Sequence, residues 1–256
     1  MVDKTRIIII FVSRAGSRRK RLLNGILNAG KMTMLQKVLK EVDSITESNA
    51  DEVFGSIAKQ LFRGFCIDQG GVKYRFLEIE FYYFSPVHKD LLESCERPFV
   101  YARNSEKTGT FLVHSSGLDI CFEGEVKADG VDSRGGGILI RSLLRIDKND
   151  QSAVVTGPWD CMDALINYTN GENFPRIVAL ENINDNVSCR SARRYNDKST
   201  LKENRYCFYD GQYVDEERNY WVLDNQKLER YDPVTRGTKP EYHEKPWKRK
   251  DKSLRM

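Results

Sequence analysis

The stretch R-F-L-E-I-E-F-Y-Y, residues 75–83, decides the fold of this 256-residue chain. Aromatic and branched residues dominate it, and both kinds favour β-strands. Because side chains alternate between the two faces of a strand, one face would be apolar and the other polar. The apolar face would hold Leu77, Ile79, Phe81 and Tyr83, and the polar face Glu78, Glu80 and Tyr82. The sequence therefore predicts a long strand with two carboxylates that point the same way.

The residues before this strand predict two helices and a hairpin. Apolar residues recur at helical spacing from Leu35 to Ile45. A second amphipathic helix would start at Ser48 or Asn49 as N-cap and end at Gly64. The chain would then enter a short strand at Phe65–Ile67, turn through 68–71, and return along Tyr74–Phe84.

The residues after this strand predict further strands and a third helix. The strands are expected at Thr110–His114, Leu118–Phe122 and Gly137–Ile146, and the helix after Thr156. Asp210-Gly211, between two aromatic runs, predicts another hairpin. Together these elements predict an α/β (α+β) fold, in which a curved, mostly antiparallel sheet is flanked by short helices.

Charge divides the chain into three parts. Residues 1–32 hold eight Lys or Arg and one acid, and residues 239–256 hold seven and three, whereas positions 33–238 carry a net charge of −7. Residues 1–31 also lack apolar periodicity, so we expect a disordered segment or sequence upstream of the true start. One domain is expected over residues 32–236, followed by a basic tail at 237–256.

Several classes of protein do not fit this sequence. Its longest apolar run, Ile7–Val12, is too short to span a membrane and falls short of a typical secretory leader. The six cysteines form no C-x-x-C pair, and the three histidines have no metal-ligand spacing. We therefore expect a cytoplasmic, monomeric protein with reduced thiols and with neither a metal nor another cofactor.

The most suggestive chemistry lies in the strand at 75–83. A carboxylate such as Glu80 beside an aromatic ring such as Tyr82 suits the activation of water next to a flat substrate. The alternative is that these residues form the solvated face of an ordinary antiparallel strand. Residue types alone leave both interpretations open.

Five segments, in the same order, resemble the methylpurine (alkyladenine) DNA glycosylase family and cover roughly residues 57–166. R-F-L-E-I-E-F-Y is similar to the family's Arg-Ile-Val-Glu-Thr-Glu-Ala-Tyr. The five segments are I-A-K-Q-L-F-R-G-F-C-I (57–67), R-F-L-E-I-E-F-Y (75–82), T-G-T-F-L-V-H-S-S-G (108–117), G-G-I-L-I-R-S-L (136–143) and T-G-P-W-D-C-M-D-A-L (156–165).

The resemblance implies a role for each matching residue. Glu80 would be the base that activates water, Tyr82 would stack on an extruded base, and His88 and His114 would line the base pocket. Arg141 would support that pocket. No lysine stands in the nucleophile position, so the implied reaction is hydrolysis without strand cleavage.

Two positions depart from the family's pattern. Ser116 stands where the family has a Tyr wedge, and Glu123 stands where it has a pocket Asn. An ionised carboxylate only accepts hydrogen bonds, so Glu123 in the pocket would favour cationic bases or bases with an amino group. The resemblance therefore leaves the identity of the base open.

A basic, aromatic-interleaved segment follows, in which Arg190, Arg193, Arg194 and Lys198 are candidate phosphate contacts, although a solvated loop would look the same. The predicted function is a DNA glycosylase that hydrolyses the bond to a flipped, modified base. The alternatives are a hydrolase acting on RNA or free nucleosides, and a non-catalytic nucleic-acid-binding module on the same scaffold.

Overall fold

The computed structural model describes residues 10–11, 32–101, 103–126, 130–131, 133–149, 151–166, 174–215, 220–224, 226–232 and 237–239. Its helices are α1 (Met34–Leu39), η1 (Lys40–Ser44, a 3-10 helix), α2 (Ala50–Gly64), α3 (Pro158–Ile166) and η2 (Gly211–Tyr213, a 3-10 helix). Its strands are β1 (Ile10–Phe11), β2 (Phe65–Gln69), β3 (Val72–Phe84), β4 (Arg103–Glu106), β5 (Phe111–His114), β6 (Gly117–Cys121), β7 (Gly124–Val126), β8 (Gly135–Ile146), β9 (Ser152–Thr156), β10 (Arg176–Ala179), β11 (Cys189–Ala192), β12 (Cys207–Asp210), β13 (Val214–Asp215), β14 (Tyr220–Leu223), β15 (Gln226–Lys227), β16 (Arg230–Asp232) and β17 (Gly237–Lys239).

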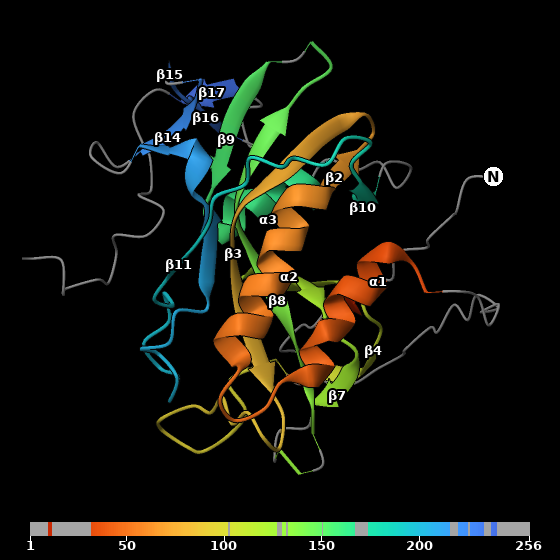
Figure 1. The fold of residues 1–256 in the computed structure, drawn as a ribbon, viewed down its shortest axis with the longest axis vertical. Coiled ribbons are helices and arrows are strands. Elements are labelled where there is room, and N and C mark those ends of the chain that lie inside the picture. Colours follow the sequence, from red (N-terminus) through yellow and green to blue (C-terminus); the bar gives the residue numbers. More distant parts are fainter. Residues whose placement is uncertain are drawn as a thin grey trace, which may run out of the picture.

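One large, curled sheet organises the fold. Its strand order is β1-β5-β6-β8-β3-β12-β11, while β2 and β10 extend the sheet beside one end of β3 and β9 pairs with β8. The pairings are antiparallel except for β1 with β5 and β16 with β9. The predicted fold class, a curved and mostly antiparallel sheet with a few short helices, is confirmed. The long strand quoted first, β3, lies at the centre of this sheet (Figure 1).

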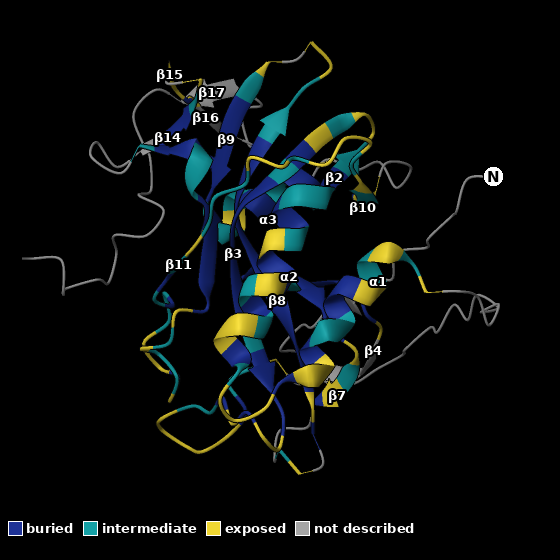
Figure 2. Ribbon diagram, in the orientation of Figure 1, coloured by how far each residue is buried: buried dark blue, intermediate teal, exposed yellow. Residues whose placement is uncertain are grey.

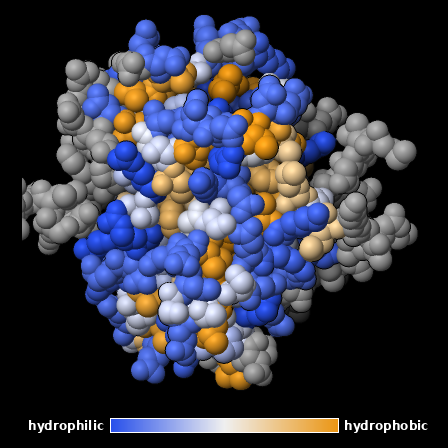
Figure 3. Space-filling view, viewed as in Figure 1, coloured by the Kyte–Doolittle hydropathy of each residue, from blue (hydrophilic) through white to orange (hydrophobic). Residues whose placement is uncertain are grey.

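The helices cover one face of the sheet, which we call the helix face. In Figure 1, α1 and α2 lie in front of it, and Figure 2 shows α2 buried toward the strands and exposed on its outer side. Phe54 of α2 stacks on Phe81 of β3 with ring centroids 4.6 Å apart. A capping box between Thr33 and Gln36 fixes the start of α1. Figure 3, in the same view, shows a mostly hydrophilic surface with scattered hydrophobic residues.

The pairing of β3 with β8 is irregular at the carboxylates. Phe76 pairs with Leu143 and Ile79 pairs with Ile140, so two residues of each strand fall between these pairs. Such a bulge reverses the alternation of side chains. Leu77 therefore packs with Trp221 on the opposite face, not with Ile79 as the period of two predicted. We call that opposite face, which also carries Glu78 and Glu80, the polar face.

The hairpin predicted around Asp210-Gly211 is wrong. Strand β12 pairs with β3 and β11, whereas β13 pairs with β14. The Asp210 carboxylate accepts hydrogen bonds from the backbone N–H groups of Ser188 (3.0 Å) and Gln212 (3.2 Å). This cap starts η2, which leads the chain out of the large sheet instead of back along it.

The predicted outer segments are partly included in the sheet. Ile10 and Phe11, from the segment expected to be disordered, pair in parallel with Leu112 and Val113. Strand β17, from the expected tail, pairs with β16. The remaining residues of 1–31 and of 237–256 lie outside the described residues. No helix in the described part of the chain is both long and apolar enough to cross a membrane.

Candidate functional site

Glu80 and Arg141 form a buried ion pair at the centre of the polar face. Arg141 Nη1 donates to Glu80 Oε2 over 2.7 Å, and the Glu80 side chain is fully buried. Burial alone would lower the pKa of Arg141, but the Glu80 and Glu78 carboxylates raise it above its usual value. The arginine therefore stays charged and holds the Glu80 carboxylate in place. The structure thus brings together two of the residues that the resemblance singled out.

Tyr195 covers this ion pair. Its backbone N–H donates to Glu80 Oε1 over 3.0 Å, and its ring lies 3.4 Å from the Arg141 Cζ atom. Both carboxylate oxygens of Glu80 are therefore engaged by protein groups. A water molecule or substrate can reach Glu80 only if the segment that carries Tyr195 moves.

Glu78 is a second buried carboxylate on the same face. Ser142 Oγ donates to Glu78 Oε2 over 3.0 Å, Cys207 Sγ donates to Oε1 over 3.4 Å, and Arg141 Nε lies 3.8 Å from Oε1. Burial raises the pKa of Glu78 to about 7, although Arg141 and Ser142 oppose that shift. Two carboxylates share one arginine, and Glu78 binds a proton near neutral pH.

Glu78 should make the protein less stable as the pH rises. Its pKa in the folded state is above the value in the unfolded chain, so the folded state binds more protons between pH 4.5 and about 7. The free energy of unfolding should therefore fall across this window. A glutamine cannot titrate, so Glu78→Gln should not lose this stability. From pH 5 to pH 8, the free energy of unfolding of the variant should rise by about 2 to 3 kcal/mol relative to that of wild type. Urea denaturation at pH 5 and pH 8 measures these free energies of unfolding. An equal change with pH in wild type and Glu78→Gln would contradict the raised pKa of Glu78.

Tyr82 lies over a second buried ion pair. Arg194 Nη1 forms an ion pair with Asp90 Oδ2 at 2.8 Å and donates to Ser199 Oγ over 3.1 Å. Arg194 Cζ lies 4.3 Å from the Tyr82 ring centroid and 5.4 Å from that of Phe99. Burial and the Glu80 carboxylate raise the pKa of Tyr82 well above its usual value, so its hydroxyl stays protonated. Tyr82 thus links the two ion pairs.

His114 occupies the far side of the polar face. Its Nε2 contacts Asp119 Oδ1 at 2.9 Å, and its Nδ1 accepts the Ser116 N–H over 3.1 Å. Asp119 and Glu80 both pair with Leu139 of the intervening β8. His114 therefore lies two to three strand spacings, roughly 10 to 14 Å, from β3. This leaves the strip of β8 around Leu139 between Tyr82 and His114.

His88 lies on the helix face of the sheet, against α2. Its imidazole contacts the Tyr83 carbonyl oxygen at 3.0 Å and the Tyr206 hydroxyl at 2.9 Å, and packs edge-on against Phe54. Burial lowers its pKa, so the ring is neutral at physiological pH. The resemblance placed His88 in the base pocket, whereas the short turn from Ser85 to His88 brings its ring against Phe54 of α2.

Glu123 lies outside the candidate site. It follows the last residue pair of β6 and forms an ion pair with Lys40 at 3.0 Å, with 55% of its side chain exposed. Phe122, the preceding residue, packs on the helix face against Phe81. The structure therefore places Glu123 away from Glu80 and Tyr82, and the candidate site does not include the pocket wall expected at Glu123.

The basic segment offers fewer phosphate contacts than predicted. Arg194 is fully buried, and Arg193 pairs with Glu203 at 2.7 Å. Lys202 likewise pairs with Glu93 at 2.6 Å. Arg190 and Lys198 keep exposed side chains. The segment serves in part to hold Tyr195 over Glu80, which composition could not indicate.

No protein-family model, curated protein or solved structure matches the chain. The site therefore has to be interpreted from its own geometry.

Within the described ranges, no group of three or more His, Cys, Asp or Glu side chains is arranged to hold a metal ion. A pocket of about 280 Å³ lies near Arg75, toward the other end of β3 from Tyr82. The candidate site is centred on Glu80 because the buried charges of Glu78, Glu80 and Arg141 gather there.

Proposed function

We propose that the protein hydrolyses the N-glycosidic bond of a modified base in DNA and that Glu80 activates the attacking water. The observation that supports it best is the fully buried Glu80 carboxylate, held by Arg141 at 2.7 Å beside the Tyr82 ring. A buried carboxylate held in a fixed position can accept a proton from a water molecule that it directs at the sugar carbon.

The substrate base would lie on the polar face over the strip of β8 around Leu139. Tyr82 on one side and His114 on the other have flat rings that can replace the stacking lost when a base leaves the duplex, once Arg194 and Tyr101 move off them. The described contacts of Glu80 include no lysine, so the product is an abasic site in an intact strand. Substrate entry requires the Tyr195 segment to open.

Trp159 would supply the aromatic contact to nucleic acid that Ser116 cannot supply. It is 55% exposed and follows Pro158 at the start of α3. A Cβ atom at Gly117 would lie 2.8 Å from Pro158 Cβ and 3.1 Å from Leu139 Cδ1. The start of α3 therefore borders the same strip of β8.

Trp159→Ala should weaken binding to DNA about tenfold, because stacking of one base on an aromatic ring is worth about 1 to 3 kcal/mol. Fluorescence anisotropy with a labelled oligonucleotide measures this change. Met34→Ala is the matched control, since Met34 is an exposed apolar side chain at 64% on α1, which covers the helix face. Equal affinities for the two variants would show that Trp159 does not contact DNA.

A second candidate is a hydrolase that acts on RNA or on free nucleosides. The closed state of Glu80 under Tyr195 favours it, because a small substrate needs a smaller opening than a duplex. The pairing of Arg193 and Lys202 with acids favours it as well, since fewer cations remain for a duplex backbone.

One experiment separates these candidates. The protein is incubated with DNA duplexes, RNA and free nucleosides that each carry methylated adenine, methylated guanine or hypoxanthine, and the released base is quantified by chromatography. Release from DNA alone supports the proposal. Release only from RNA or nucleosides supports the second candidate, and release from none would leave a non-catalytic binding module.

A further inference from the structure

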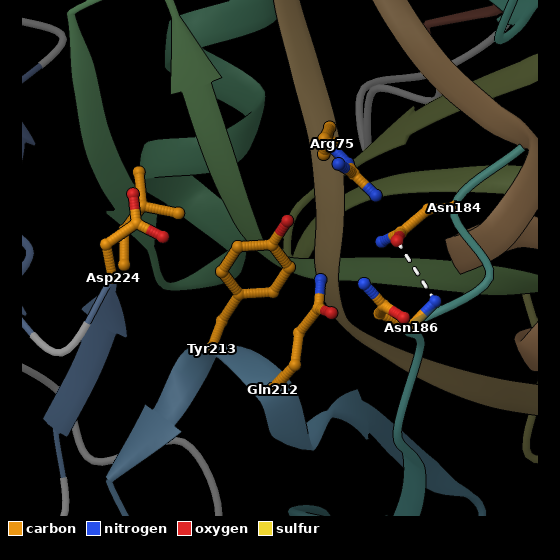
Figure 4. Close-up of a pocket in the computed structure, with 7 residues that line it drawn as sticks. Arg75, Asn184, Asn186, Gln212, Tyr213 and Asp224 are labelled. Carbon is orange, nitrogen blue, oxygen red and sulfur yellow. Dashed lines mark hydrogen bonds between the residues drawn. The ribbon is translucent and has the colours of Figure 1, made fainter. Parts of the chain in front are cut away.

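A polar pocket of about 280 Å³ lies at the Arg75 end of β3, where β3 meets the C-terminal part of the chain. Tyr213 lies in the middle of it, and the polar ends of Arg75, Asn184, Asn186 and Gln212 converge on one side of that ring (Figure 4). Asp224 lies on the other side. The residues that line the pocket are Arg75, Asn184, Asn186, Gln212, Tyr213, Leu223 and Asp224.

Two hydrogen-bond donors in this pocket lack a partner in the described part of the chain. They are Arg75 Nη2 and Asn184 Nδ2, and both atoms are buried from solvent. A buried N–H group without an acceptor is unfavourable, and more so when the group is charged. The pocket thus holds a cation and a neighbouring amide that both need an acceptor.

The fold holds these donors in place. The Asn184 N–H donates to the Arg63 carbonyl at the end of α2 over 2.9 Å. Asn184 Oδ1 accepts the Asn186 N–H over 3.2 Å, which leaves Nδ2 as the end of the amide that lacks a partner in the described part of the chain. Arg75 Cζ lies 5.7 Å from the Tyr213 ring centroid. Donors from β3 and from the β10–β11 loop are therefore arranged around one space.

We propose that this pocket binds a phosphate group. A guanidinium pairs strongly with phosphate oxygens, and donors that approach from separate elements suit a tetrahedral anion better than a planar carboxylate. The volume exceeds by several times the roughly 30 Å³ that one water molecule occupies in the liquid. Room therefore remains for the group that carries the phosphate.

The phosphate could belong to a small molecule or to a nucleic-acid backbone. Arg75 precedes Glu80 by five residues along β3, a separation of roughly 16 Å. A backbone phosphate a few nucleotides from the substrate base is within that reach. The pocket does not depend on the proposed hydrolysis, because none of its residues contacts Glu80 in the described structure.

Inorganic phosphate is the first probe. Titration followed by NMR should shift the side-chain amide signals of Asn184 and Gln212, with chloride at equal ionic strength as the reference. Asn184→Asp should weaken phosphate binding about tenfold or more, because it puts a carboxylate beside Arg75 and repels the anion. Asn149→Asp, with the same charge change on the exposed β8–β9 turn, should bind like wild type.

A second variant tests the pocket if Asn184→Asp does not fold. Gln212→Glu brings a carboxylate into the same space from η2, and either variant is used once its urea unfolding curve matches wild type. Unshifted amide signals, or wild-type phosphate affinity in a folded variant, would overturn the proposal.

An oligonucleotide identifies the source of the phosphate. If the site takes a backbone phosphate, Asn184→Asp should weaken DNA binding about tenfold while Asn149→Asp does not. If only inorganic phosphate binding changes, the ligand is a small phosphorylated molecule. The same titration with Glu80→Gln should match wild type, so failure of the hydrolase proposal would leave this result unaffected.

Discussion

Glu80→Gln should reduce the rate of base release about a thousandfold and leave the affinity for modified DNA within a few-fold of wild type. The amide cannot take a proton from water, and general bases contribute about 10² to 10⁴ to a rate. The amide keeps one oxygen for Arg141 but places an NH2 group opposite the Tyr195 N–H, so the affinity measured for Glu80→Gln also checks that the site keeps its structure. Single-turnover rates and equilibrium binding, measured on the same oligonucleotide, separate the two effects.

Two further variants sharpen this prediction. Glu123→Gln removes an exposed carboxylate and should leave the rate unchanged. Glu78→Gln should have a milder effect than Glu80→Gln, because Ser142 and Cys207 hold Glu78 further along the strand. A Glu80→Gln protein that releases base at the wild-type rate would remove Glu80 from the mechanism.

Asp90→Ala should cost about 3 to 5 kcal/mol of folding free energy. It leaves the Arg194 guanidinium fully buried without its counter-charge, and a buried charge without its partner is strongly destabilising. Domains of this kind are stable by about 5 to 15 kcal/mol, so the loss is a large fraction of the total. Urea denaturation at pH 7 measures it.

Asp185→Ala is the matched control. It breaks the ion pair of Asp185 with Arg63, in which the aspartate side chain is 77% exposed, and should cost no more than about 1 kcal/mol. Adding Arg194→Leu to Asp90→Ala should restore part of the lost stability, because no buried charge then remains. If Asp90→Ala and Asp185→Ala unfold at the same urea concentration, the Arg194 cluster does not stabilise the fold.

The residues on strands could be predicted from the sequence. Glu80 and Arg141 sit in long segments with strong strand composition, and the structure pairs them across β3 and β8. The alternation of two predicted the face of Glu80 correctly, but it misplaced Leu77. The irregular pairing at Glu78 shifts the alternation of side chains, which periodicity alone cannot reveal.

The residues on loops could not be predicted. Tyr195, Asp90 and Ser199 reach the site only because two loops fold over β3, and no periodic signal marks such contacts. Arg194 belonged to a basic run typical of a solvated surface, yet Asp90 draws it into the interior. Glu123 lies just past the end of β6, where an ion pair with Lys40 holds it outside the site.

The mass of a DNA strand after incubation tests the central claim most directly. An oligonucleotide that carries one methylated or deaminated purine is incubated with wild-type protein or with Glu80→Gln and then weighed intact by mass spectrometry. With wild type, the proposal predicts a full-length strand in which one base is replaced by a hydroxyl group, and with Glu80→Gln an unchanged strand. An unchanged strand with wild type, or the same loss with both proteins, would contradict it.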